Sequence, residues 1–108
     1  MKQFRNEITI CGIVGQSHVT AVADTETAQF SVMTEDSYRS RDGGAVVNCT
    51  WFSVRAWKGA GIAELSKIIK GSWVEVHGKQ RCCRYAGEDG AERVSYEILA
   101  DTVRLVED

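Results

Sequence analysis

The tryptophans and the arginine of segment 46–58, VVNCTWFSVRAWK, form the most informative chemical pattern of the chain. The segment is rich in β-branched and aromatic residues and contains no proline, which predicts a β-strand. Because the side chains of a strand alternate between two faces, Trp51, Arg55 and Trp57 share one face. The other face suits a hydrophobic core and consists of Thr50, Phe52, Val54 and Ala56.

A solvated sheet face with two indoles beside an arginine is a surface on which single-stranded nucleic acid can stack. Cys49 and Ser53 lie on the same face, and the serine favours contact with water. The alternative interpretation is that the tryptophans face the core and that Arg55 lies at its rim. The strand alone leaves both interpretations open.

Positive charge is concentrated in the middle of the chain, although the net charge of the whole chain is −2. Residues 38–84 contain nine Lys and Arg against three Asp and Glu, a net charge of +6, and all three tryptophans. Residues 1–37 carry −3 and residues 85–108 carry −5. This segregation of charge is the pattern expected of a surface that binds phosphates.

The cysteines and histidines show no spacing that catalysis or metal binding requires. The four cysteines are Cys11, Cys49, Cys82 and Cys83. They form no C-x-x-C pair, so we expect reduced thiols. A zinc site built from His77, Cys82 and Cys83 is the weaker alternative. Since His18 and His77 lie in no nucleophile motif, we expect neither an enzyme nor a cofactor.

Length and hydropathy predict a single domain over residues 1–108. With 44% hydrophobic and 26% charged residues, the chain can form a core. No apolar run approaches the roughly 18 residues needed to span a membrane, and the first seven residues lack the apolar segment of a signal peptide. We therefore expect a cytoplasmic protein.

Alternation of apolar and polar residues predicts strands separated by turns. The predicted strands are 6–14 with a continuation near 19–23, 27–34, 46–58, 72–84, and 94–99 with a last short strand or extension at 102–106. Glycine and charged residues at 35–44 and 87–90 predict hairpin loops. In the first strand, Gly12 and Gly15 indicate a bulge or close packing.

Residues 59–70 change period, because apolar side chains recur there at helical spacing before Gly71. This pattern predicts a helix that ends in a glycine cap. The order is then three strands, one helix and two strands. A five-stranded Greek-key β-barrel with a helix between strands 3 and 4 is the OB-fold, so we expect an all-β fold of this class, which binds oligonucleotides or oligosaccharides.

Five segments of the sequence together are specific for one protein family, although no single segment is. They are NEITICGIVG at 6–15, TAQFSVMT at 27–34, CTWFSVRAWK at 49–58, KGSWVEVHGK at 70–79 and EILAD at 97–101. On these segments, from Ile8 to Val106, the chain resembles bacterial single-stranded DNA-binding proteins.

The resemblance implies roles for individual residues. The implied base-stacking side chains are Tyr38, Trp51, Trp57 and Tyr85. The implied phosphate contacts are Arg39, Arg41, Arg55, Lys58, Lys79, Arg81 and Arg84, with Arg5 and Arg93 as further candidates. Trp73 falls outside this set, and we expect it in the core or in a subunit interface.

The resemblance also implies binding of single-stranded DNA with little sequence preference, during replication, repair or recombination. It implies a bacterial homo-oligomer, a tetramer or a dimer. The family's long tail with an acidic tip has no counterpart in this sequence, which argues against recruitment of replication proteins through it. Two alternatives stay open: a primosome-like or RNA-binding OB-fold protein, and an OB-fold module whose tryptophan face binds another protein.

Overall fold

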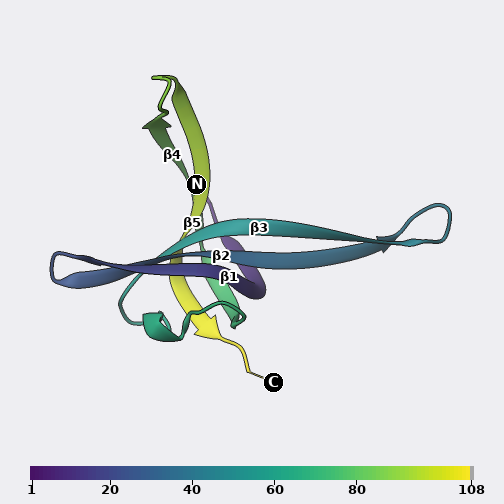
Figure 1. The fold of residues 1–108 in the computed structure, drawn as a ribbon, viewed down its shortest axis with the longest axis horizontal. Helices are drawn as coiled ribbons and strands as arrows, with labels where there is room; N and C mark the ends of the chain where they lie inside the picture. Colours follow the sequence, from purple (N-terminus) through teal and green to yellow (C-terminus); the bar gives the residue numbers. More distant parts are fainter. Residues whose placement is uncertain (108) are drawn as a thin grey trace.

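Long β-strands form most of the chain in the computed structural model, which describes residues 1–107 (Figure 1). The strands are β1 (Ile8–Val22), β2 (Thr25–Arg39), β3 (Ala45–Trp57), β4 (Trp73–Ala86) and β5 (Glu92–Leu105). They pair in the order β1-β2-β3-β5-β4, and β4 pairs with β1, so the sheet closes into a barrel. The ladder between β3 and β5 is parallel and the other ladders are antiparallel. This is the predicted barrel of the OB-fold.

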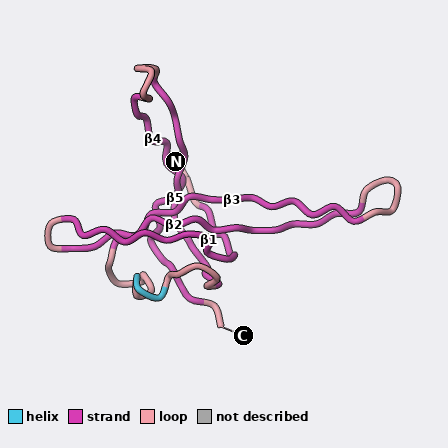
Figure 2. Tube along the Cα trace, viewed as in Figure 1, coloured by secondary structure: helices cyan, strands magenta, loops and turns pink. Residues whose placement is uncertain are grey.

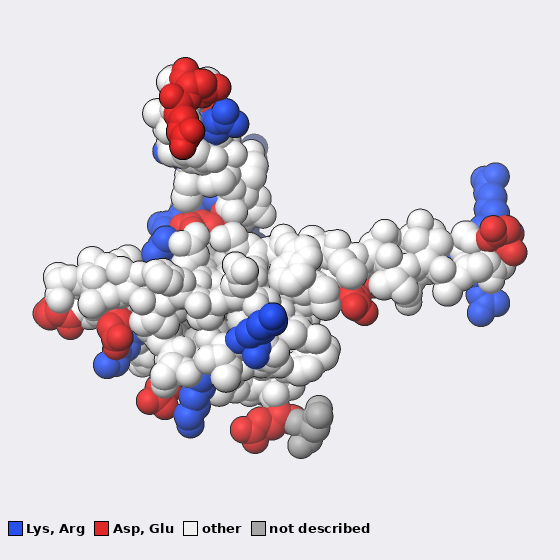
Figure 3. Space-filling model, in the orientation of Figure 1, with Lys and Arg blue, Asp and Glu red and all other residues white. Residues whose placement is uncertain are grey.

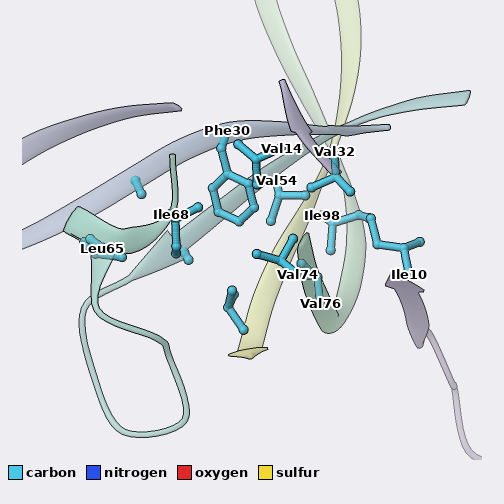
Figure 4. Close-up of a cluster of buried hydrophobic side chains, with 13 residues drawn as sticks. Ile10, Val14, Phe30, Val32, Val54, Leu65, Ile68, Val74, Val76 and Ile98 are labelled. Carbon is cyan, nitrogen blue, oxygen red and sulfur yellow. The ribbon is translucent and has the colours of Figure 1, made fainter. Parts of the chain in front are cut away.

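Alternating side chains of all five strands fill the barrel (Figure 4). The buried hydrophobic residues are Ile10, Val14, Ala28, Phe30, Val32, Val54, Ala56, Leu65, Ile68, Val74, Val76, Ile98 and Val103. The core face predicted for the third strand is confirmed at Val54 and Ala56, and Phe52 packs against the core. Thr50 does not belong to the core, because β3 has left the barrel at that point and the residue is exposed.

Within residues 1–107, three hairpins extend from the barrel as arms (Figures 1 and 2). We name them the β1–β2 arm (residues 17–30), the β2–β3 arm (33–51) and the β4–β5 arm (81–97). The β2–β3 arm keeps one register from Thr27–Trp57 to Arg39–Ala45. The β2–β3 arm packs on the core at its base alone, so toward its tip the side chains on both of its faces are open to solvent.

The helix predicted over 59–70 is present as a three-residue 3-10 turn, η1 (Leu65–Lys67). Residues 61–63 run beside β5. The N–H of Ala63 donates to the carbonyl of Val103 at 2.8 Å, and the N–H of Val103 donates to the carbonyl of Gly61 at 2.9 Å. Gly61 has a φ of +85°, which a right-handed helix cannot contain. These bonds to β5 take the place of the bonds inside a helix.

The apolar residues that suggested this helix close one end of the barrel instead. Leu65 and Ile68 are 6% and 1% exposed and contact the core, whereas Ile69 is 57% exposed. The glycine cap predicted at Gly71 is wrong, since η1 ends at Lys67 and its C-cap is Ile68. Gly71 instead adopts a φ of +91° in the turn before β4.

Candidate nucleic-acid interface

The tryptophan face of β3 is open to solvent. Trp51 and Trp57 are 59% and 40% exposed, whereas Val54 and Ala56 on the opposite face are fully buried. The interpretation that placed the tryptophans in the core is therefore wrong. Arg55 lies between the two indoles with its side chain 26% exposed. The outer face of β3 thus presents an aromatic ring on either side of a cation.

The indole of Trp51 lies over Gly15 of β1. The β1–β2 register shifts between Val14 and Ser17, so the predicted bulge in the first strand is confirmed. A Cβ atom at Gly15 would overlap the indole, with Cη2 of Trp51 only 2.9 Å away. The ring therefore reaches across β2, which lies between β3 and β1, and occupies the space that a side chain at position 15 would fill.

A buried acid holds two of the arginines that the sequence assigned to phosphates. Glu97 of β5 is 8% exposed. Nε of Arg81 donates to Oε1 of Glu97 at 2.8 Å, and Nε of Arg55 lies 3.6 Å from the same oxygen. Arg55 also donates to Oε1 of Gln29 at 3.3 Å. We name Arg55, Arg81 and Glu97 the arginine cluster. It carries a net charge of +1 and connects β3 with β4 across the outer face of β5.

The four predicted stacking rings do not form one patch. Trp51 lies at the base of the β2–β3 arm and Trp57 ends β3 in the barrel, whereas Tyr38 lies near the tip of the β2–β3 arm and Tyr85 near the tip of the β4–β5 arm. Tyr38 and Tyr85 are 55% and 52% exposed. In the β2–β3 register, Met33 pairs with Trp51 and shares its face of the sheet. By alternation along β2, Tyr38 points to the opposite face. A strand that contacts all four rings must therefore wind around the barrel and its arms.

The remaining predicted phosphate contacts differ in their surroundings. Arg39 and Arg41, at the tip of the β2–β3 arm, and Lys79 of β4 form no ion pair with any of residues 1–107. Lys58 lies 3.9 Å from Glu26, and Arg84 lies 3.6 Å from Glu92. In Figure 3 the tip of the β2–β3 arm carries basic groups, whereas acidic groups crowd the tip of the β4–β5 arm. Phosphate attraction is therefore stronger at the first tip than at the second.

The turn at the tip of the β2–β3 arm is fixed by its own hydrogen bonds. The Ser40 hydroxyl and the N–H of Gly44 both donate to the Asp42 carboxylate. These bonds, that of Ser40 first, lower the pKa of Asp42. The turn thereby holds the backbone at Arg39 and Arg41 in one conformation.

A groove of about 790 Å³ borders the tryptophan face and runs from the β1 bulge to the segment around η1. Gln29, Ser31 and Ser53 line it from the sheet, and Lys70 lines it from the η1 side. The hydroxyl of Ser17, next to the bulge, is buried without a hydrogen-bond partner among residues 1–107. Phe30, Leu65 and Ile69 also line the groove, so it is mixed polar and apolar in character.

Two residues at this surface were missed by sequence reasoning. Tyr96 of β5 is 61% exposed and pairs with Cys82 of β4. Glu97 follows it and forms the centre of the arginine cluster. The signal for Glu97 was present, because an acid beside the apolar Ile98 and Leu99 in a strand calls for a cationic partner. Tyr96 had no comparable signal in the sequence.

Trp73 and the cysteines lie elsewhere. Trp73 is 50% exposed at the start of β4, so its assignment to the core is wrong and the subunit interface stays a prediction. All four cysteines are free, and Cys49 is exposed on the β2–β3 arm. Among residues 1–107, no three His, Cys, Asp or Glu side chains gather in a way that could hold a metal ion. No helix in this part of the chain is long and apolar enough to cross a membrane.

Comparison with known proteins gives a consistent picture. The model of the single-strand binding protein family matches residues 5–106. A single-stranded DNA-binding protein of Neisseria meningitidis serogroup A is 25% identical over 103 residues, which cover 94% of this chain and 59% of that protein. One from Xanthomonas axonopodis pv. citri is 27% identical over 103 residues, with 94% and 57% covered. The chain thus spans less than two thirds of the length of these relatives.

Solved structures share the fold. The structure described as Plasmodium falciparum SSB complex with ssDNA superposes with a TM-score of 0.79 and 17% identity and covers 99% of both chains. The small single-stranded DNA-binding protein of Streptomyces coelicolor gives a TM-score of 0.67 at 21% identity and covers 94% of this chain and 96% of that one.

Proposed function

Because the chain belongs to the single-strand binding protein family, we propose that it binds single-stranded DNA with little sequence preference and protects the strand during replication, repair or recombination. The observation that carries this proposal is the exposed outer face of β3, where Trp51 and Trp57 flank Arg55. The action is binding without a chemical step. We place it in the bacterial cytoplasm, on the nucleoid.

Stacking supplies affinity that does not depend on sequence. Each base stacked on an aromatic side chain contributes about 1–3 kcal/mol, and every base has a π-face. The proposed stacking residues are Tyr38, Trp51, Trp57 and Tyr85. Since Tyr38 and Tyr85 lie on separate arms, the proposed path of the strand runs along β3 and turns onto both arms.

Phosphate contacts supply the salt-dependent part of the affinity. Neutralising phosphates releases counterions, so binding weakens as the salt concentration rises. The proposed contacts are Arg39, Arg41, Arg55, Lys58, Lys79, Arg81 and Arg84. Among them, Arg39, Arg41 and Lys79 contribute most, because the others share their charge with a neighbouring acid in the free protein.

We also propose that the protein acts as a homo-oligomer, a tetramer or a dimer, in which Trp73 lies at a subunit contact. Half of the Trp73 side chain is exposed in the single chain, and β5 separates β4 from β3 in the barrel. Several barrels joined in this way would raise the effective concentration of individually weak sites along one strand of DNA.

The variant that carries both Trp51→Ala and Trp57→Ala tests the proposal. We expect it to bind fluorescently labelled oligo-dT about 30-fold or more weakly than the parent, since two stacked bases are lost at about 1–3 kcal/mol each. Both side chains lie outside the core, so the variant should keep the parental fold and oligomeric state, with a modest loss of stability from the partly buried indoles. Val22→Ala is the control, since Val22 is also exposed and has no role in the proposed interface, and it should bind as the parent does.

Parental affinity in the double variant would contradict the role of the β3 face. Competition between dT and U oligomers of equal length for the parent protein then shows whether the protein prefers DNA or RNA. If neither oligomer binds the parent, the tryptophan face serves a protein partner instead.

A further inference from the structure

We propose that the outer face at the base of the β1–β2 arm holds a further nucleotide of single-stranded DNA, with His18 stacked on its base and Gln29 donating a hydrogen bond to it. This inference rests on the proposed binding of single-stranded DNA and extends that surface beyond β3. Neither residue belongs to the stacking or phosphate contacts proposed above. Both line the groove of about 790 Å³ that borders the tryptophan face.

A row of polar side chains crosses the outer face of the sheet, and each of the five strands contributes one of them. We name this row the polar belt: Arg81 of β4, Glu97 of β5, Arg55 of β3, Gln29 of β2 and His18 of β1. Arg81 pairs with Glu97, and Nε of Arg55 lies 3.6 Å from Oε1 of Glu97. On the other side, Gln29 pairs with both Arg55 and His18. Because directly paired side chains share a face, the belt continues from the arginine cluster onto the β1–β2 arm.

The belt meets the stacking surface at two places. Arg55 lies between Trp51 and Trp57 on β3, so the belt crosses this strand between the two indoles. The indole of Trp51 also reaches across β2 to Gly15, which lines the same groove as His18. A nucleotide next to a base stacked on Trp51 is therefore at the edge of the groove, where His18 is the aromatic side chain that β1 contributes.

The amide of Gln29 is oriented by Arg55. Nη2 of Arg55 donates to Oε1 of Gln29 at 3.3 Å. A guanidinium can only donate, so the atom that faces it is the carbonyl oxygen of the amide, and the two N–H donors point away from Arg55. Bases and phosphates both carry acceptor atoms, so these donors can bind a nucleotide of any sequence.

The charge and size of the groove suit a nucleotide. Lys70 supplies a positive charge and forms no ion pair with any of residues 1–107, and none of the acids in this part of the chain lines the groove. A phosphate in the groove is therefore attracted. The volume falls within the range of about 300–1,000 Å³ that is usual for small-molecule sites. His18 is exposed, and an imidazole can stack on an unpaired base.

Variants at the two residues test the subsite by their affinity for labelled oligo-dT. His18→Ala removes the ring and should weaken binding by about 5- to 150-fold, the range that corresponds to one stacked base. His18→Phe keeps a ring and should bind as the parent does. Gln29→Ala should weaken binding by about 2- to 12-fold, which corresponds to one hydrogen bond. His77→Ala is the matched control, since His77 pairs with Thr9 at the other end of β1, and it should bind as the parent does.

Nuclear magnetic resonance of the imidazole rings observes the contact directly. The chain contains two histidines, so the spectrum of His77→Ala assigns both signals. Saturating oligo-dT should shift the ring protons of His18 upfield, because they then lie against the face of a base. The ring protons of His77 should not shift.

Parental affinity in His18→Ala or Gln29→Ala, or an unshifted His18 signal at saturating oligo-dT, would overturn the subsite and leave the proposed function intact if the parent binds oligo-dT. A parent that does not bind oligo-dT would overturn both. A changed oligomeric state of His18→Ala in light scattering would also overturn the subsite, because the groove would then receive a second copy of the chain.

Discussion

Replacing Gly15 by alanine tests how the structure holds its central stacking ring. Gly15 does not have a left-handed φ, so alanine fits the backbone there. What it lacks is space, because the indole of Trp51 occupies the position of the new methyl group. The variant therefore displaces Trp51 without changing any residue that contacts DNA in the proposed function.

The size of the displacement follows from the distances. Carbon atoms in contact are about 3.5–4.0 Å apart, whereas the alanine Cβ would lie 2.9 Å from Cη2 of Trp51 and closer to Cζ3. The indole must therefore shift by about 1 Å or leave its rotamer, at a cost of roughly 0.5–1.5 kcal/mol. If the displaced ring no longer stacks a base, about 1–3 kcal/mol of binding free energy is lost, which weakens Kd by about 5- to 150-fold.

Fluorescence anisotropy of labelled oligo-dT measures this Kd, and the emission spectrum of the free protein reports the environment of the indole. Gly59→Ala is the matched control, since its Cβ would have no neighbour nearer than the Trp57 carbonyl oxygen at 3.8 Å. The control should bind as the parent does. The reasoning is refuted if Gly15→Ala keeps both the parental Kd and the parental emission spectrum.

Two further predictions concern charged groups. Glu97→Gln should lower the free energy of unfolding by about 1–2 kcal/mol, because its two half-exposed arginine partners lose their counter-charge. It should also steepen the salt dependence of oligo-dT binding by roughly 0.7 in log K per log salt for each phosphate gained; an unchanged slope would show that the arginines do not meet phosphates. The pKa of His77 is raised from its usual 6.5, first by the hydrogen bond to Asp101, then by the charge of Asp101, with a smaller effect of Glu7. Protonated His77 therefore stabilises the fold fully below pH 6.5, and this contribution is lost as the pH rises through the raised pKa. The urea midpoints of the parent and of His77→Gln should converge as the pH rises above 6.5. A difference that stays constant with pH would argue against the stabilising interaction between His77 and Asp101.

The sequence was sufficient to predict the barrel and the exposed face of β3. Alternation with a period of two determines which side chains of a strand share a face. The polar Ser53 and Arg55 favoured the tryptophan face as the wet one, and the basic middle of the chain and the family resemblance supported that choice. Gly15 in an apolar strand indicated a bulge, and the register confirms it. The alternation and the glycine are local signals, which a single strand carries by itself.

Features that depend on long-range packing were not predictable in the same way. Apolar spacing over 59–70 fitted a helix, but a segment that closes a barrel with Leu65 and Ile68 produces the same spacing. The distance of Tyr38 from the tryptophans depends on how far the β2–β3 arm extends beyond the barrel. The partners of Glu97 depend on how β3, β4 and β5 come together in the barrel, and no local pattern records that arrangement.

The central claim is that the tryptophans of β3 stack on single-stranded DNA. Its most direct test is a titration of the parent protein with oligo-dT while intrinsic tryptophan fluorescence is recorded. We predict strong quenching, because Trp51 and Trp57 are two of the three tryptophans, and recovery of the fluorescence when salt is added. Unchanged fluorescence at saturating oligo-dT would contradict the claim.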